Sequence, residues 1–286
     1  MGGSAYESGT AGPALLGSVE KENAMDLSNW RTVIQQFKGW LRQSDPQHGR
    51  NWNNLLRSDD EAALCEAMTW QVLNEQGVVV EPNADLTGGG RRPDFRCTKN
   101  NQVFYVEATC VHTSTLEAKT GLPSSGAHPP IAVRWQGFLQ AVFSECRNKT
   151  PQCADLDAPC VLAVGTFHAA ACMSFIKKKF VIEQLLTGET KMAWDVNTKS
   201  GETSHVYHVT KLWSAGFLKP GESTVDKARC PISALLLGGF GICSRPVCGL
   251  LHPAPVRPFD RHLLPGIEFC RLKDGYERGE LETEWI

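Results

Sequence analysis

Apolar residues near the N-terminus recur at helical spacing. Across Asp26–Gln43 they fall three or four positions apart, which predicts an amphipathic helix. A polar break follows over Asp45–Asn54, and the pattern predicts a second helix over Asp59–Gln76. Ser58 and Glu61 have the spacing of a capping box at the start of this helix, and Gly77 is predicted to end it.

Strand patterns follow the second helix. Val78–Val80 is a short β-branched run, and Gln102–Val111 is the clearest strand in the chain because it is rich in aromatic and β-branched residues. Pro93–Cys97 is predicted to begin the strand before it, after the flexible basic loop Gly88–Arg92. The short turn Lys99–Asn101 is then expected to fold these two strands into an antiparallel pair.

Helix and strand patterns alternate in the following part. We predict helices over Ile131–Arg147 and Ala169–Leu186, and strands over Cys160–Phe167, Ile232–Leu237 and Val247–Leu251. The order helix, strand, strand, strand, helix, strand over residues 59–167 predicts an α/β protein with a central mixed sheet flanked by helices.

These elements suggest one elaborated domain with additions. Its expected parts are a flexible N-terminus (1–22), an N-terminal helical extension (23–57), the core (58–187), an insertion or hairpin (188–230), and C-terminal strands with an extended, frayed tail (231–286).

The charge balance limits the possible partners. The 286 residues are 42% hydrophobic and 21% charged, which is ordinary globular usage, and their formal net charge is −2. Nonspecific nucleic-acid binders usually carry a basic excess, because they neutralise phosphates. Any nucleic-acid contact is therefore expected to come from a local patch.

Cysteine usage and hydropathy indicate the compartment. The eleven cysteines include no CxxC pair and follow no signal-peptide pattern, which is typical of free, buried thiols in a reducing compartment. The longest apolar run, Ile232–Cys243, is too short to span a bilayer. We expect a cytoplasmic protein without a membrane partner.

One carboxylate stands inside the clearest strand. Glu107 lies in an otherwise apolar run, and a buried anionic carboxylate is costly unless a cation, a metal or several donors neutralise it. Successive strand residues alternate faces, so one face is expected to hold Phe104, Val106, Ala108 and Cys110, and the other Tyr105, Glu107 and Thr109.

Asp94 is the expected companion of Glu107. It begins the preceding strand, and the turn between the strands brings the two carboxylates together. Two adjacent carboxylates repel each other, and a divalent cation such as Mg²⁺ or Mn²⁺ is the usual resolution.

Pro93-Asp94 followed by Glu107-Ala108-Thr109 resembles the motif of the PD-(D/E)XK (restriction-endonuclease-like) superfamily, with Thr109 at the lysine position. The resemblance covers about residues 59–167 and implies a restriction-endonuclease-like core. It also implies that Asp94 and Glu107 are metal ligands, and that Glu66 on the preceding helix is a further ligand or holds a metal-bound water.

The resemblance implies further site residues as well. Gln136, on the next helix, stands where related proteins often place a polar residue facing the site. Threonine offers only a neutral hydroxyl in place of the family's lysine, so Arg134 or Lys119 is expected to supply the missing charge. Glu61 is instead accounted for locally by its capping box.

Other readings of the same residues stay open. Asp94 also fits a strand-start residue, and Glu107 also fits a buried salt bridge with Arg91, Arg92 or Arg96. The run Lys177–Lys179, with Arg91 and Arg92, fits either a phosphate contact or a solvated helix face.

The leading hypothesis is a metal-dependent phosphodiesterase that acts on nucleic acid, with DNA expected rather than RNA. A catalytically silent nuclease-like module for binding or scaffolding is the alternative, and an unrelated α/β domain is a third. The hypotheses differ in geometry, because the first two require Asp94 and Glu107 in one cleft.

Overall fold

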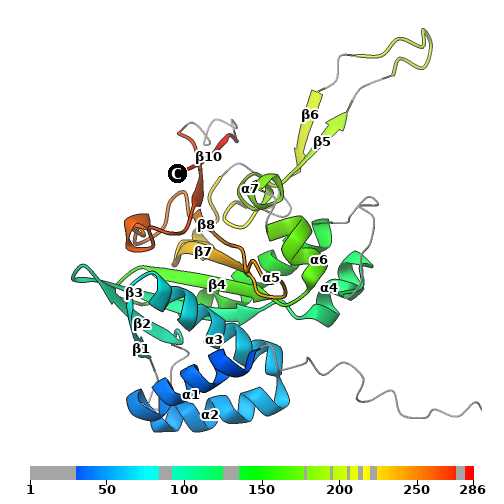
Figure 1. The fold of residues 1–286 in the computed structure, drawn as a ribbon. Helices are drawn as coiled ribbons and strands as arrows, with labels where there is room; N and C mark the ends of the chain where they lie inside the picture. The colour runs from blue at the N-terminus through cyan, green and yellow to red at the C-terminus, as the bar shows by residue number, and fades with distance from the viewer. Residues whose placement is uncertain are drawn as a thin grey trace, which may run out of the picture.

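The chain folds around one large mixed β-sheet with helices on both faces (Figure 1). The computed structural model describes residues 30–83, 92–124, 135–176, 179–193, 196–204, 207–211, 215–219, 224–274 and 281–286. Eight strands form the sheet in the order β1-β2-β3-β4-β7-β8-β9-β10. The predicted α/β class with a mixed sheet flanked by helices is confirmed.

Three consecutive helices cover one face of the sheet. They are α1 (Arg31–Ser44), α2 (Pro46–Ser58) and α3 (Asp60–Glu75), and α3 lies between the first two and the strands (Figure 1). The prediction of a polar break at 45–54 was wrong, because α2 occupies this segment. Its few apolar residues lie on one side, where Trp52 is buried and Leu55 and Leu56 are half-buried in the apolar cluster shared with the neighbouring helices.

Asp45 explains why a helix begins in so polar a segment. Its side-chain oxygen accepts hydrogen bonds from the backbone N–H groups of Gln47 and His48, both at 2.9 Å. Pro46 follows at the first helical position, where its missing N–H has no consequence. The cap and the proline together fix the start of α2.

Removing this cap should destabilise the protein measurably. We expect Asp45→Ala to lower the free energy of unfolding by about 1 kcal/mol, the usual size of an N-cap contribution. Asp45→Asn keeps the acceptor oxygen and should retain most of the stability. Urea denaturation of both variants checks this, and equal loss in the two would show that the charge matters rather than the cap.

The predicted capping box at Ser58 was also wrong. Asp59 is the N-cap of α3, and its carboxylate accepts from the Ala62 N–H at 3.0 Å. Ser58 ends α2, where its hydroxyl bonds to backbone carbonyls of that helix. The Glu61 carboxylate instead accepts from the Thr113 N–H at 2.8 Å, which joins α3 to the segment after β3.

Three antiparallel strands follow α3: β1 (Val79–Pro82), β2 (Phe95–Lys99) and β3 (Gln102–Cys110). Asn100 and Asn101 form the predicted turn between β2 and β3, and both have positive φ, at 52° and 61°. This is the conformation of a tight hairpin turn, in which asparagine is favoured.

The chain then crosses to a parallel strand. It passes through α4 (Thr113–Thr120) and α5 (Trp135–Cys153) and enters β4 (Cys160–Thr166), which runs parallel to β3. The helix predicted over 131–147 is α5, and it continues six residues beyond the predicted end, through Pro151.

The rest of the sheet comes from the C-terminal part of the chain. Its strands are β7 (Ile232–Gly239), β8 (Val247–Leu251), β9 (Phe269–Leu272) and β10 (Thr283–Trp285). The prediction of a frayed tail was wrong for residues 281–286, because β10 pairs with β9 along the sheet edge.

The helix predicted over 169–186 is interrupted. The described residues form α6 (Ala169–Ala171), a π-helical turn (Cys172–Ile176) and α7 (Lys179–Thr187). Beyond α7, β5 (Glu189–Ala193) and β6 (Tyr207–Lys211) pair as a separate two-stranded sheet. The described residues also include 3₁₀ turns at Lys227–Arg229 and Arg261–Leu263.

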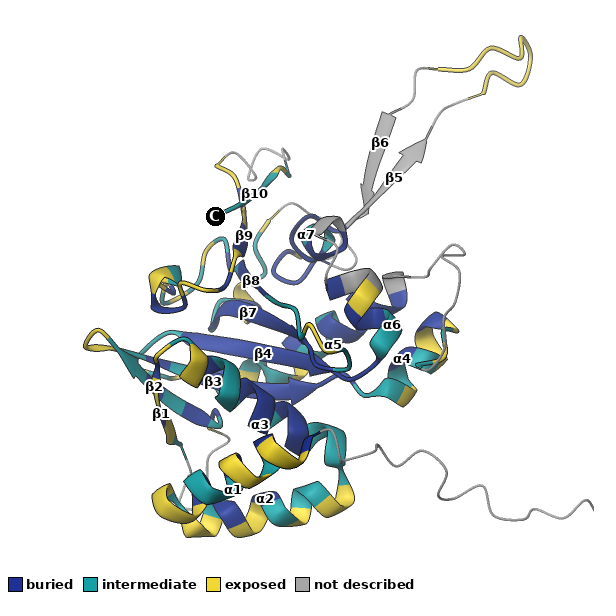
Figure 2. Ribbon diagram, viewed as in Figure 1, coloured by how far each residue is buried: buried dark blue, intermediate teal, exposed yellow. Residues whose placement is uncertain are grey.

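The sheet is buried on both faces (Figure 2). One apolar cluster joins it to α1, α2 and α3, and the other joins it to α5 and α7. The first cluster contains Phe104, Val106, Ala108 and Cys110, as the predicted strand alternation requires. Among the described residues, no helix is long and apolar enough to cross a membrane.

Candidate functional site

The candidate site lies where β2 begins and β3 ends. Phe95 pairs with Val106 in the antiparallel register, so the preceding Asp94 lies opposite the following Glu107. Both side chains line a cavity of about 370 Å³. Its other charged lining residues are Glu66 from α3, Arg92 before β2, and Glu145 and Lys149 from α5. The structure therefore brings Asp94, Glu107, Glu66 and Thr109 together around one cavity.

Lys149 neutralises the buried glutamate. Its Nζ lies 2.8 Å from Glu107 Oε1, and the Glu107 side chain is only 3% exposed. The predicted arginine partners were wrong in the described part of the chain, because Arg96 pairs with Glu81 at 2.8 Å. Arg91 lies outside the described residues.

The pair shifts the protonation of both groups. Burial raises the pKa of Glu107, although Lys149 partly offsets the rise. Burial alone lowers the pKa of Lys149, but the Glu107 carboxylate and then Asp94 raise it above its usual value. The lysine is therefore held in its charged form inside the cavity.

Among the carboxylates that line the cavity, Asp94 is in the environment least favourable to its negative charge. Its Oδ2 accepts a hydrogen bond from the Ala108 N–H at 2.7 Å, which fixes the side chain across the end of β3. Burial, followed by the negative charges of Glu107 and Glu66, raises the pKa of Asp94 well above its usual range. An added cation at this point would relieve the repulsion.

Among the described residues, three buried oxygens around the cavity find no hydrogen-bond partner: Glu66 Oε2, Glu107 Oε2 and Gln152 Oε1. Glu66 Oε2 lies 3.9 Å from His48 Nε2, which is too long for a hydrogen bond. Unpartnered carboxylate oxygens beside a repelled aspartate are a donor set that suits Mg²⁺ or Mn²⁺. Within the described residues, however, no three His, Cys, Asp or Glu side chains form a ready-made metal cluster.

Thr109 has a structural contact at the motif position. Its hydroxyl donates to Glu145 Oε2 at 2.7 Å. Glu145 precedes Lys149 by one helical turn on α5, so this bond holds the same face of the helix that presents the lysine. Thr109 therefore anchors α5 to β3 and leaves the positive charge to Lys149.

The remaining predicted residues have different outcomes. Arg134 and the side chain of Gln136 lie outside the described residues. Lys119 is exposed on α4 and does not line the cavity, so it was the wrong source of positive charge. Gln152, near the end of α5, is the described glutamine that lines the cavity.

Lys149 was not recognised from the sequence. The predicted helix ended at Arg147, ahead of the lysine, whereas the observed helix α5 continues to Cys153. The signal that could have found it is the four-residue spacing of Glu145 and Lys149, which puts the two side chains on one helix face. His112 also lines the cavity, and its Nε2 lies 3.0 Å from both carboxylate oxygens of Asp59.

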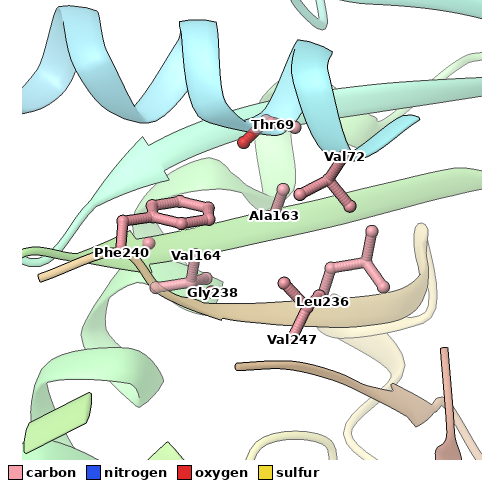
Figure 3. Close-up of a pocket in the computed structure, with 9 residues that line it drawn as sticks. Thr69, Val72, Ala163, Val164, Leu236, Gly238, Phe240 and Val247 are labelled. Atoms are coloured by element: carbon pink, nitrogen blue, oxygen red, sulfur yellow. The ribbon is translucent and has the colours of Figure 1, made fainter. Parts of the chain in front are cut away.

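A second, apolar pocket lies between α3 and the strands β4 and β7 (Figure 3). It holds only about 10 Å³ and no charged side chain lines it. A space of this size takes one water molecule at most. It is a packing gap, and the carboxylate-lined cavity is the better candidate for chemistry.

The fold and the site define an α/β protein with a buried acid–lysine cluster at the end of two antiparallel strands. Comparison with protein-family models, with curated proteins and with solved structures finds no match for this chain.

Proposed function

We propose that the protein is a metal-dependent phosphodiesterase of the PD-(D/E)XK type that cleaves nucleic acid, DNA rather than RNA. The observation that carries the proposal is the Lys149–Glu107 ion pair, which puts a lysine into a cavity lined by Asp94 and Glu66. Lys149, on α5, supplies the positive charge that Thr109, on β3, lacks.

The order of elements supports a restriction-endonuclease-like core. In chain order, α3 precedes the antiparallel strands β1, β2 and β3, and α4 and α5 then lead to the parallel strand β4. These four strands are adjacent in the sheet. The site lies at the point where β2 and β3 separate, and residues from α3 and α5 reach it from the two faces.

Asp94, Glu107 and Glu66 would hold Mg²⁺ or Mn²⁺. When bound, such an ion activates water and stabilises negative charge on a phosphate. Lys149 Nζ has three donors and gives one to Glu107 Oε1, which leaves two for a water or a phosphate oxygen in the cavity. Arg92, exposed at the rim, offers a second cation to the phosphate.

A cytoplasmic location completes the proposal. Nine of the eleven cysteines are buried, which supports their use as small apolar side chains in a reducing compartment.

A cleavage assay tests the proposed function. Purified protein is incubated with supercoiled plasmid, linear duplex DNA, single-stranded DNA and RNA, with Mn²⁺, Mg²⁺ or EDTA. We expect metal-dependent cleavage of DNA that Glu107→Gln abolishes. Glu81→Gln removes an exposed glutamate from an ion pair outside the cavity and serves as the matched control. Absence of cleavage on every substrate would overturn the proposal, and binding without cleavage would identify a silent module.

A further inference from the structure

The two N-terminal helices carry a local positive charge that the chain as a whole does not have. Residues 31–58 contain five lysines and arginines and a single acid, Asp45, so their net charge is +4. The whole chain has a net charge of −2, which leaves −6 for the other residues. Residues 31–58 are therefore net cationic, whereas the other residues taken together are net acidic.

None of these five cations is neutralised by an acid of the described chain. Arg50 donates to the neutral amide oxygen of Gln47, and Lys38 lies over the Trp52 ring at 5.8 Å. No ion pair with a described residue is formed by Arg31, Arg42 or Arg57. The lysine and arginine ion pairs found among the described residues all lie outside these two helices, at Arg96, Lys149, Arg229, Arg271 and Lys273.

The exposed side of α2 forms a regular polar stripe. Gln47, Arg50, Asn54 and Arg57 are all exposed and follow one another three or four positions apart, so they lie on one helix face. Arg50 and Arg57 are two turns apart, about 10 Å along the axis. The single acid does not interrupt the stripe, because the Asp45 carboxylate caps the start of α2.

This side of the molecule adjoins the candidate site. Leu55 of α2 lines the cavity, two residues before Arg57, and α2 leads through Asp59 directly into α3, which carries Glu66. Figure 2 shows exposed residues along the outer sides of α1 and α2, away from the sheet. An extended polyanion on α2 would thus lie next to the cavity rim.

We infer that the outer face of α1 and α2 binds the phosphate backbone of nucleic acid and delivers it to the cavity. This inference rests on the proposed function and adds the surface that holds the substrate. Arginine and amide side chains are the usual contacts to phosphate oxygens, and they fix the position of a nucleic acid without reading its sequence. The binding should therefore be nonspecific in sequence and strongly dependent on salt.

The test compares two charge-reversed variants. Arg50→Glu/Arg57→Glu changes the proposed surface, and Lys199→Glu/Lys227→Glu makes the same charge change at exposed lysines outside α1 and α2. Binding of a fluorescein-labelled duplex DNA is measured by anisotropy in EDTA over a series of salt concentrations. We expect the first variant to lose at least about tenfold in affinity, and the slope of log K against log salt to fall by about 2, since each phosphate contact contributes about 0.9. The control should keep the wild-type slope.

Two further arms separate this inference from the proposed function. Metal-dependent hydrolysis of bis(p-nitrophenyl) phosphate, a diester too small to reach α2, should be unchanged in Arg50→Glu/Arg57→Glu while duplex cleavage falls. If wild-type protein cleaves DNA but both variants bind it equally well, the surface assignment is overturned and the function stands. Loss of binding to phosphatidylserine vesicles without loss of DNA binding would also overturn it, in favour of a membrane surface.

Discussion

Replacing Lys149 with methionine is expected to lower the rate of metal-dependent cleavage by about 10²–10³-fold, the usual effect of removing one preorganised electrostatic group. The reason is the position of the ammonium, 2.8 Å from Glu107 and inside the carboxylate-lined cavity. Thr109 cannot compensate, because its hydroxyl is bonded to Glu145. The readout is the single-turnover rate on duplex DNA.

Two companion variants separate catalysis from stability. Lys149→Met leaves Glu107 buried without a cation, which destabilises a fold by itself. Lys149→Arg keeps the ion pair but replaces the compact ammonium by a planar fork, and we expect it to fold normally and still lose most of the rate. Thr109→Lys/Lys149→Met places the lysine on β3, and this variant should recover part of the cleavage rate. A Lys149→Met variant that is folded and fully active would contradict the role of this lysine.

Replacing Asp94 with asparagine should make the metal-free protein more stable while it abolishes cleavage. Burial and two neighbouring carboxylates raise the pKa of Asp94 in the folded state, so the folded protein favours the protonated form. This contribution to stability is fully present below the unfolded pKa, about 3.9, and is lost as pH rises through the folded value. At neutral pH the buried Asp94 carboxyl therefore costs the wild type stability, and Asp94→Asn removes this cost.

The expected gain is about 1–2 kcal/mol at neutral pH, in the range that single stabilising substitutions commonly give. Asparagine keeps an oxygen that can accept from the Ala108 N–H, so the backbone contact survives. Thermal unfolding of both proteins in EDTA at several pH values checks this, since the extra stability of Asp94→Asn over the wild type should vanish at acidic pH. Addition of Mn²⁺ should raise the Tm of the wild type alone. An Asp94→Asn variant that is less stable than wild type at neutral pH would contradict this electrostatic account.

The sequence predicted the central part of the site because local rules control it. The turn at Asn100 and Asn101 sets the register of β2 and β3, and that register determines that Asp94 faces Glu107. Strand alternation likewise determined which residues of β3 enter which apolar cluster. Both inferences need only neighbouring residues.

The features that the sequence did not predict depend on contacts distant in the chain. The helix α5 continues through Pro151 because tertiary packing overrides the local preference, and this continuation includes Lys149 within the helix. The polar helix α2 depends on a cap and on Trp52, which is buried against α3 and donates to the Ala63 carbonyl at 3.0 Å. The strand β10 exists through its pairing with β9 at the sheet edge.

The most direct test of the central claim is metal binding by the carboxylates of the cavity. Isothermal titration calorimetry with Mn²⁺ is performed on the wild type and on Asp94→Asn/Glu107→Gln, each with and without duplex DNA. The account predicts a saturable site in the wild type that the double variant lacks. Binding of equal strength in both proteins, or in neither under both conditions, would contradict a metal site at Asp94 and Glu107.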